Sequence, residues 1–243
     1  MAKTIKTFDF KPGRRIGRRY LVEARLGGGT EGEVYRIREQ DTGIVRAAKL
    51  YFPHQNLKGR RSIQHARKLN TLRRCPIVLQ YHHSEVITVR KEQVVALVSD
   101  LCEGEQLGSW VARHRGKRLS PYQALHVLYN LARGIEAIHL LGEYHADVHT
   151  DNILIKPMGV RFDLTLVDFY DWGPPAAYKR KQDIRDTIEV FCECLGNHRT
   201  CAQMHPDIRY ICGGRRRDVI LRRFPTMTAL RKHLESFEWS GLL

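Results

Sequence analysis

The clearest hydrophobic pattern lies in the middle of the chain. Apolar residues at positions 128, 131, 135 and 138 keep the spacing of one helix face. This helix is expected to begin at Ser120, because Pro121 suits the first turn and Gln123 completes a capping box with the serine. A polar segment, 145–152, follows the helix, and Ile153-Leu154-Ile155 then predicts a short strand. The polar segment therefore lies between two ordered elements.

The pattern changes along the chain. Residues 20 to about 101 alternate short apolar strands with one helix, at about Ser62 to Arg73. In the second half, residues 183–194 predict another helix, with Gly196 just beyond its end. We find no internal repeat and no low-complexity linker. A strand-rich first part and a helix-rich second part indicate an α+β protein.

Four short motifs carry candidate chemistry. They are the glycine segment Leu26–Tyr35 with Gly27, Gly29 and Gly32, the strand Val45–Tyr51 with Lys49, the polar loop with Asp147 and Asn152, and Asp168 after the apolar run 164–167. Each motif alone also fits an ordinary structural role, such as a hairpin turn, an edge lysine with an exposed head or a cap. Their joint presence in this order favours the interpretation that all four belong to one functional site.

This series of motifs resembles the protein-kinase superfamily over about residues 20–237. The resemblance implies a bilobal α+β fold, with a small, mostly antiparallel β-sheet lobe that carries one helix and a mainly helical second lobe. We expect a basic N-terminal arm at 1–19, an N-lobe at 20–101 and a short C-lobe at 102–243. It also implies ATP and Mg²⁺ as cofactors.

The resemblance also assigns roles to single residues. Asp147 would be the catalytic base and Lys49 would hold the α and β phosphates, while Asn152 and Asp168 would bind the metal. The nucleotide would further contact Gly27, Gly29, Gly32, Val34, Ala47, Asp100, Cys102 and Leu154. Plain core packing explains Val34, Ala47 and Leu154 equally well. Asp183 would brace the catalytic loop.

The chain departs from the family pattern at several positions. The helix that normally supplies a glutamate partner for the lysine has no acid in Ser62–Leu69, and Gln64 is the expected neutral substitute. Ala146 stands where an arginine usually precedes the catalytic Asp, as in Rio kinases, and His149 replaces a lysine, as in small-molecule kinases. Tyr170 replaces a glycine. Only fifteen positions separate Asp168 from Asp183, so a full activation segment does not fit.

Three functions compete. The first is a constitutively active Ser/Thr protein kinase, which the retained catalytic residues favour. The second is a small-molecule (metabolite) kinase, which His149 and the short segment favour. The third is a nucleotide-binding pseudokinase scaffold, which the missing glutamate favours, although a scaffold has no chemical reason to keep Lys49, Asp147, Asn152 and Asp168 together.

Charge adds an expectation about partners. The 243 residues carry a formal net charge of +15, concentrated partly before residue 20 and partly at 215–223. Such runs are usually solvated faces, but two of them favour an acidic protein substrate, or contact with nucleic acid or a ribonucleoprotein. No apolar stretch is long enough to predict a membrane span, and residues 1–6 lack the apolar core of a secretion signal, so a cytoplasmic location is expected.

The six cysteines are expected to be buried free thiols rather than metal ligands. Cys192 and Cys194 lie two positions apart in a predicted helix, so their side chains point to nearly opposite sides and cannot bind one ion together.

Overall fold

The computed structural model of the chain describes residues 4–169, 173, 176–213 and 217–236. The chain forms two compact units. The first comprises Met1–Arg73 and Leu79–Cys102, and the second comprises Arg74–Val78 and Glu103–Leu243. The bilobal α+β fold expected from the sequence is confirmed.

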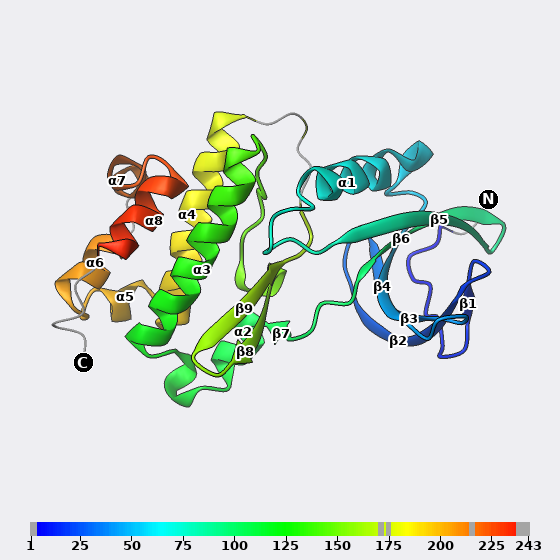
Figure 1. The fold of residues 1–243 in the computed structure, drawn as a ribbon, viewed down its shortest axis with the longest axis horizontal. Helices are drawn as coiled ribbons and strands as arrows, with labels where there is room; N and C mark the ends of the chain where they lie inside the picture. The colour runs from blue at the N-terminus through cyan, green and yellow to red at the C-terminus, as the bar shows by residue number, and fades with distance from the viewer. Residues whose placement is uncertain (1–3, 170–172, 174–175, 214–216, 237–243) are drawn as a thin grey trace. The chain divides into compact units, whose positions relative to one another are not determined.

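The first unit is built on a six-stranded antiparallel sheet in the order β1-β2-β3-β4-β6-β5 (Figure 1). The strands are β1 (Arg15–Ile16), β2 (Tyr20–Gly28), β3 (Gly32–Glu39), β4 (Val45–Tyr51), β5 (Tyr81–Val89) and β6 (Glu92–Asp100). A short 3₁₀ turn, η1 (Leu57–Gly59), leads into helix α1 (Arg60–Thr71). Alternation explains the core, since Tyr35 and Ile37 of β3 are fully buried while the residues between and beside them are not.

The residues expected to form a basic arm pack against this sheet. Ile5 and Phe8 belong to its buried core. The buried carboxylate of Glu33 accepts hydrogen bonds from Thr7 Oγ1 at 2.8 Å and from the amide of Phe8 at 3.2 Å. Burial alone would raise the pKa of Glu33, but hydrogen bonds from Tyr35 and Thr7 outweigh it and lower that pKa. Apolar burial and one satisfied carboxylate therefore hold the arm in the first unit.

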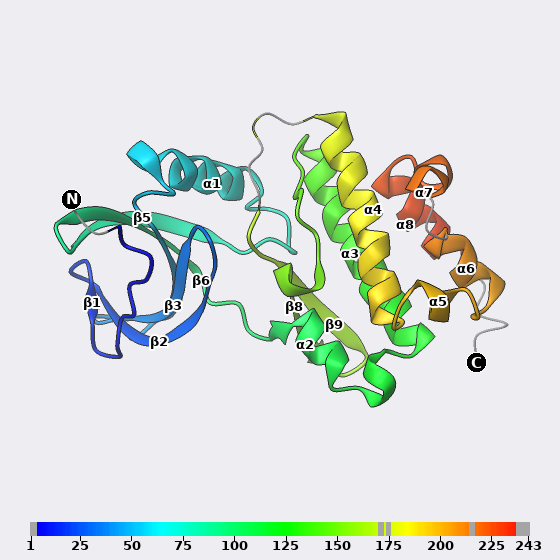
Figure 2. The ribbon, with the colours of Figure 1, turned by 180° about the vertical axis from the view of Figure 1, so that it is seen from behind.

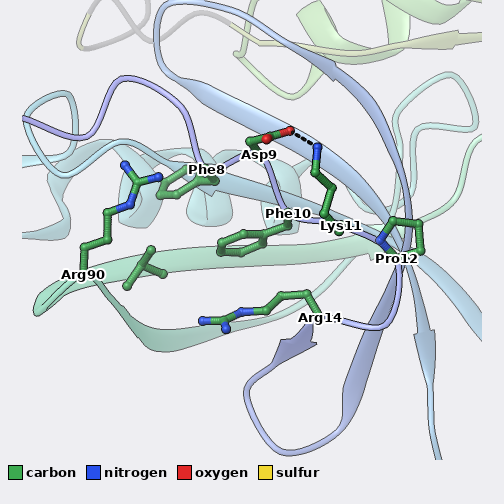
Figure 3. A pocket seen from close by; sticks show the side chains of 8 residues that line it. Phe8, Asp9, Phe10, Lys11, Pro12, Arg14 and Arg90 are labelled. Atoms are coloured by element: carbon green, nitrogen blue, oxygen red, sulfur yellow. Dashed lines mark hydrogen bonds and ion pairs between the residues drawn. The ribbon is translucent and has the colours of Figure 1, made fainter.

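A shallow hollow lies beside this arm (Figure 3). The Arg14 guanidinium lies over the Phe10 ring, 5.4 Å from its centroid, and Arg90 also lines the hollow. Lys11 pairs with Asp9 at 2.9 Å. Part of the positive charge of the amino-terminal segment thus lies on the surface of the first unit.

The second unit is mainly helical. Its helices are α2 (Leu107–Ala112), α3 (Pro121–Leu140), α4 (Ala177–Cys194), α5 (His198–Cys201), α6 (Pro206–Cys212), α7 (Arg217–Arg223) and α8 (Met227–Glu235), with 3₁₀ turns η2 (Arg115–Lys117) and η3 (Thr150–Asn152). A small antiparallel sheet contains β7 (Glu105–Gln106), β8 (Ile153–Met158) and β9 (Arg161–Leu166). Helices α3 and α4 lie side by side, with α8 packed on α3 (Figures 1 and 2).

Helix α3 follows its sequence pattern closely. Ser120 caps it, accepting from the Gln123 amide, and the Gln123 side chain accepts from the Ser120 amide, so the predicted capping box is present. The buried stripe includes Gly134, where an added Cβ would lie 2.4 Å from Ile77 Cδ1. The helix therefore packs closely enough to require a residue without a side chain at this position.

Tyr170, expected to replace the family's glycine, lies outside the described residues.

Among the described helices, none combines the length and the apolar character needed to cross a membrane.

Candidate active site

The glycine segment forms the turn of the β2–β3 hairpin. Gly27 pairs in register with Val34, and Gly32 pairs with Tyr51 of β4. A Cβ on Gly32 would lie 1.9 Å from the Leu50 carbonyl oxygen, so Gly32 permits the close approach of two strands. A Cβ on Gly27 or Gly29 would meet no atom within 4 Å. These two glycines thus leave open space at the turn.

Lys49 is anchored in β4, opposite Val34 of β3. Its Nζ lies 3.1 Å from Glu31 Oε2, and the other oxygen of Glu31 accepts from Arg61 of α1 at 2.8 Å. The side chain of Lys49 is 14% exposed and that of Glu31 is 27% exposed, so the pair is partly shielded from water. Glu31 lies within the glycine motif itself. The motif pattern leaves this position unspecified, so no role for Glu31 could be predicted from it.

Helix α1 turns basic residues inward. His65 and Lys68 are buried, and His65 Nδ1 lies 2.5 Å from the Tyr51 hydroxyl oxygen. Gln64 is exposed on the opposite side and does not pair with Lys49. The expectation that Gln64 replaces the missing glutamate is therefore wrong, because the helix is rotated so that positions 62, 65, 68 and 69 face the interior.

The predicted adenine-contacting residues of the first unit lie at one end of β4 and β6. Ala47 is buried opposite Ser99. The Asp100 amide donates to the Gln80 carbonyl at 2.9 Å, and its carboxylate pairs with Arg46 and His82. The backbone amide of Asp100 is thus already used, and its carbonyl accepts from Ser99 Oγ at 3.3 Å. Cys102 is partly buried.

In the second unit, the polar loop brings Asp147 and Asn152 together. The Asn152 side-chain amide donates to both the backbone carbonyl and Oδ2 of Asp147, each at 3.0 Å. Asn152 is buried, whereas the Asp147 side chain is 46% exposed. His149 Nε2 lies 3.6 Å from the same Oδ2. The Asp147 carboxylate is therefore accessible to solvent, while the buried Asn152 side chain holds it through hydrogen bonds. Leu154, two residues beyond Asn152, is partly buried in β8.

Asp183 of α4 holds this loop through hydrogen bonds to its backbone. Its carboxylate is fully buried and accepts from the amides of His145 at 2.8 Å and Ala146 at 2.7 Å, and from His139 Nε2 at 2.9 Å. Ala146 adopts φ 69°, a left-handed conformation that costs free energy for a residue with a Cβ. The bracing role expected of Asp183 is confirmed by these contacts, and the bonds hold the strained backbone in place.

His145 links the loop to the segment that carries Asp168. Its Nε2 donates to the Val167 carbonyl at 3.0 Å, and its Nδ1 accepts from the Asp147 amide at 3.2 Å. The two bonds together fix the neutral Nε2–H tautomer. The Val167 amide donates to the Asn152 carbonyl at 3.0 Å, so Asp168 follows directly after a residue bonded to the loop. His145 lies within the predicted polar segment 145–152, but its hydrogen bonds on both sides depend on tertiary contacts that the sequence pattern does not show.

Asp168 also has a positive φ of 55°. Aspartate tolerates the left-handed region better than most residues. The next residue, Phe169, is buried, and its ring centroid lies 4.4 Å from that of His145. The residue after Asp168 is therefore packed against the loop that carries Asp147.

The negative charges around the loop influence a further acid. Burial raises the pKa of Asp186 to about 6, and the charges of Asp183 and Asp147 contribute in the same direction. A hydrogen bond from Gln182 Nε2, at 2.5 Å, opposes this shift. Asp186 thus lies close enough to Asp147 to respond to its charge.

Comparisons with known proteins agree with this geometry. Residues 20–192 match the family model described as "Protein kinase domain". The chain is 30% identical to the serine/threonine-protein kinase PkaA of Streptomyces coelicolor over 165 residues, covering 64% of this chain and 30% of that protein. It is 32% identical to PkaB of the same organism over 152 residues, which cover 60% of this chain and 34% of PkaB. The human MAPK/MAK/MRK overlapping kinase is 30% identical over 140 residues, covering 56% of this chain and 32% of that kinase. The chain thus spans about a third of the length of these relatives.

Proposed function

The chain belongs to the protein kinase family, and we propose that it transfers the γ-phosphoryl group of ATP to a serine or threonine hydroxyl of a protein. The observation that carries the proposal is the loop in which Asn152 and Asp183 hold Asp147 with its carboxylate toward solvent. A positioned carboxylate next to a metal-binding amide is what hydroxyl phosphorylation requires.

The residues of the second unit fit Mg²⁺. The Asn152 side chain uses its NH₂ group to bond Asp147, so its Oδ1 faces away and keeps its acceptor capacity. Asp168 supplies a carboxylate, and amide and carboxylate oxygens are the hard ligands that Mg²⁺ prefers. Bound there, the ion would neutralise negative charge on the phosphates. Asp147 would orient the hydroxyl through the oxygen that Asn152 does not bond, and then take its proton.

The first unit would hold the nucleotide. Lys49 offers an ammonium for the α and β phosphates, and the backbone at Gly27, Gly29 and Gly32 would cover them. Val34 and Ala47 would contact the adenine, which would also meet the backbone of Asp100 and Cys102, and the family pattern assigns Leu154 to the same ligand. These assignments rest on the family pattern and on the register that sets Val34 opposite Lys49.

We further propose that activity is constitutive. Ala146 replaces the arginine that would bind an activation-loop phosphate, and its amide is held by Asp183 instead. Helix α4 begins at Ala177, only nine residues after Asp168, which leaves little room for a segment that orders upon phosphorylation. The loop is therefore braced without a phosphate.

The test uses the full chain after phosphatase treatment, with an unmodified intact mass. Mixed with ATP, Mg²⁺ and an acidic protein substrate, it should form phosphoserine or phosphothreonine from the first turnover in rapid-quench samples, while Asp147→Asn should not. A lag that shortens as enzyme concentration rises would contradict constitutive activity. ATP consumption only with a metabolite extract would contradict a protein substrate.

One observation favours a second candidate, a nucleotide-binding scaffold. Glu31 neutralises Lys49, the cation that would otherwise be available to phosphates. A scaffold would bind ATP without consuming it under any of these conditions, with or without Mg²⁺.

The basic charge supports acidic partners. Arg14 and Arg90 beside the hollow in Figure 3 offer one positively charged surface on the first unit. Electrostatic attraction of this kind raises association rates for acidic proteins and falls as salt rises. Nucleic acid or ribonucleoprotein contact and a cytoplasmic location stay predictions from the sequence.

A further inference from the structure

Three cysteines far apart in the sequence meet in the second unit. Cys192 lies near the carboxyl end of α4, while Cys201 and Cys212 are the last residues of α5 and α6. Their sulfur atoms all lie within 4.8 Å of one another, and the three residues are 1%, 1% and 2% exposed. Within the part of the chain that the structure describes, they form the group of three or more His, Cys, Asp or Glu side chains whose ligand atoms all lie within 4.8 Å of one another. Cys194 is not part of it, in keeping with its opposite direction on the helix.

The spacing suits a thiolate-bound metal. Zinc–sulfur bonds of about 2.3 Å in a tetrahedral site place neighbouring sulfurs roughly 3.8 Å apart. The three sulfurs, all within 4.8 Å of one another, lie near this spacing.

His198 is the neighbour that could complete the set. It lies three residues before Cys201, at the start of α5. Its Nε2 lies 2.8 Å from Glu189 Oε2, while its Nδ1 is buried and has no hydrogen-bond partner among the described residues. Glu189 lies one helical turn before Cys192 on α4. His198 Nδ1 lies outside the 4.8 Å group that the three sulfurs form, so it would have to move to join them. A histidine held through one nitrogen by a carboxylate, with the other nitrogen buried and unbonded, is nevertheless the arrangement that commonly orients a metal ligand.

We propose that this cluster is a structural zinc site, with Cys192, Cys201 and Cys212 as thiolate ligands and His198 Nδ1 as the fourth. Binding releases three thiol protons to solvent and involves no change of oxidation state. The ion would join α5 and α6 to α4, the helix that carries Asp183. The structure agrees with the expectation of free thiols, and all of the cysteines except Cys102 are buried. The proposal goes beyond that expectation, which considered Cys192 with Cys194 and not the fold that brings Cys201 and Cys212 to the same place.

The experiment measures metal in the full chain produced with zinc in the medium and purified under reductant. Mass spectrometry of the metal content should find about one zinc per chain in the wild type, as a closed four-ligand site requires. Cys212→Ser should lose it. Cys194→Ser is the matched control, because it alters a buried thiol of the same helix and should keep the ion. Co²⁺ substitution should give the intense visible absorption of a tetrahedral thiolate site.

His198→Ala and Glu189→Gln test the fourth ligand and its support. Each should weaken zinc binding by about 10- to 100-fold in competition with a chromophoric chelator. Unchanged affinity in His198→Ala would overturn the role of His198. If Cys212→Ser does not fold, the wild type is stripped with a chelator, and its melting temperature should fall and recover when zinc is returned.

Two outcomes would overturn the site as a whole. One is wild-type protein that takes up no zinc when its reduced thiols are exposed to the free ion. The other is an intact mass, without reductant, that shows two of the three cysteines joined as a disulfide. Neither outcome affects phosphoryl transfer, so this proposal and the proposed function can fail separately.

Discussion

The pairing of Lys49 with a carboxylate of the glycine turn makes a sharp prediction about nucleotide affinity. If Lys49 binds the phosphates of ATP, Glu31 competes with them for the same ammonium. Its negative charge also lies in the loop that would cover the phosphates. Glu31→Gln should therefore tighten ATP binding, even though it removes an ion pair from the folded protein.

The size of the effect follows from the geometry. At 3.1 Å and partial exposure, a pair of this kind lies between an exposed ion pair, about 0.2–1 kcal/mol, and a well-shielded charged hydrogen bond, about 1.5–3 kcal/mol. Arg61 holds the other oxygen, which leaves the pair partly neutralised. We expect roughly 1 kcal/mol in favour of the variant, which is about fivefold in Kd.

Titration calorimetry with Mg-ATP measures this directly. Glu39→Gln is the matched control, since it removes the same charge at the far end of β3 and should leave Kd within about twofold. Glu31→Gln placed in a Lys49→Met background should have almost no effect, because the competition requires the ammonium. Weaker ATP binding in Glu31→Gln would refute the reasoning and would mean that Glu31 positions Lys49 for the nucleotide.

Further predictions concern the second unit. Asp168→Ala should abolish phosphoryl transfer with an unchanged melting curve, because Mg²⁺ requires a hard oxygen ligand, and activity within about tenfold of wild type would reject that role. The pKa of Asp186 is raised to about 6 in the fold, so the folded state binds more protons than the unfolded state between about pH 4 and 6 and loses stability as pH rises through that window. Asp186→Asn should thus stabilise the protein by about 1–2 kcal/mol at pH 8 and hardly at all at pH 4, and equal effects at both pH values in urea unfolding would contradict the shift. Gly134→Ala should destabilise by about 1–2 kcal/mol, because its Cβ meets Ile77, and Ile77→Val should restore part of the loss if crowding is the cause.

Local sequence patterns predicted the elements that depend on neighbours along the chain. The capping box at Ser120, the helical stripe of α3 and the strand after the polar loop follow from residues a few positions apart. The proximity of Asp147 and Asn152 could be predicted in the same way, because both lie within one short polar segment. Such features need no knowledge of tertiary contacts.

Contacts between distant segments could not be predicted in this way. The sequence shows that α1 lacks an acid, but the choice of Gln64 as substitute assumed a particular rotation of the helix. The fold buries His65 and Lys68 instead and leaves Gln64 in solvent. Helix rotation depends on how the whole amphipathic face packs, and one polar position does not determine it.

The acid missing from α1 has a counterpart elsewhere in the first unit. Glu31 receives Lys49 with one carboxylate oxygen and Arg61 of α1 with the other, so a single side chain joins the glycine turn, β4 and the start of the helix. A phosphate that displaces Glu31 from Lys49 must also change the surroundings of Arg61. If the chain binds ATP as proposed, binding would therefore be coupled to α1 through the turn that would cover the phosphates, because Glu31 links Lys49 to the helix although the helix itself carries no acid.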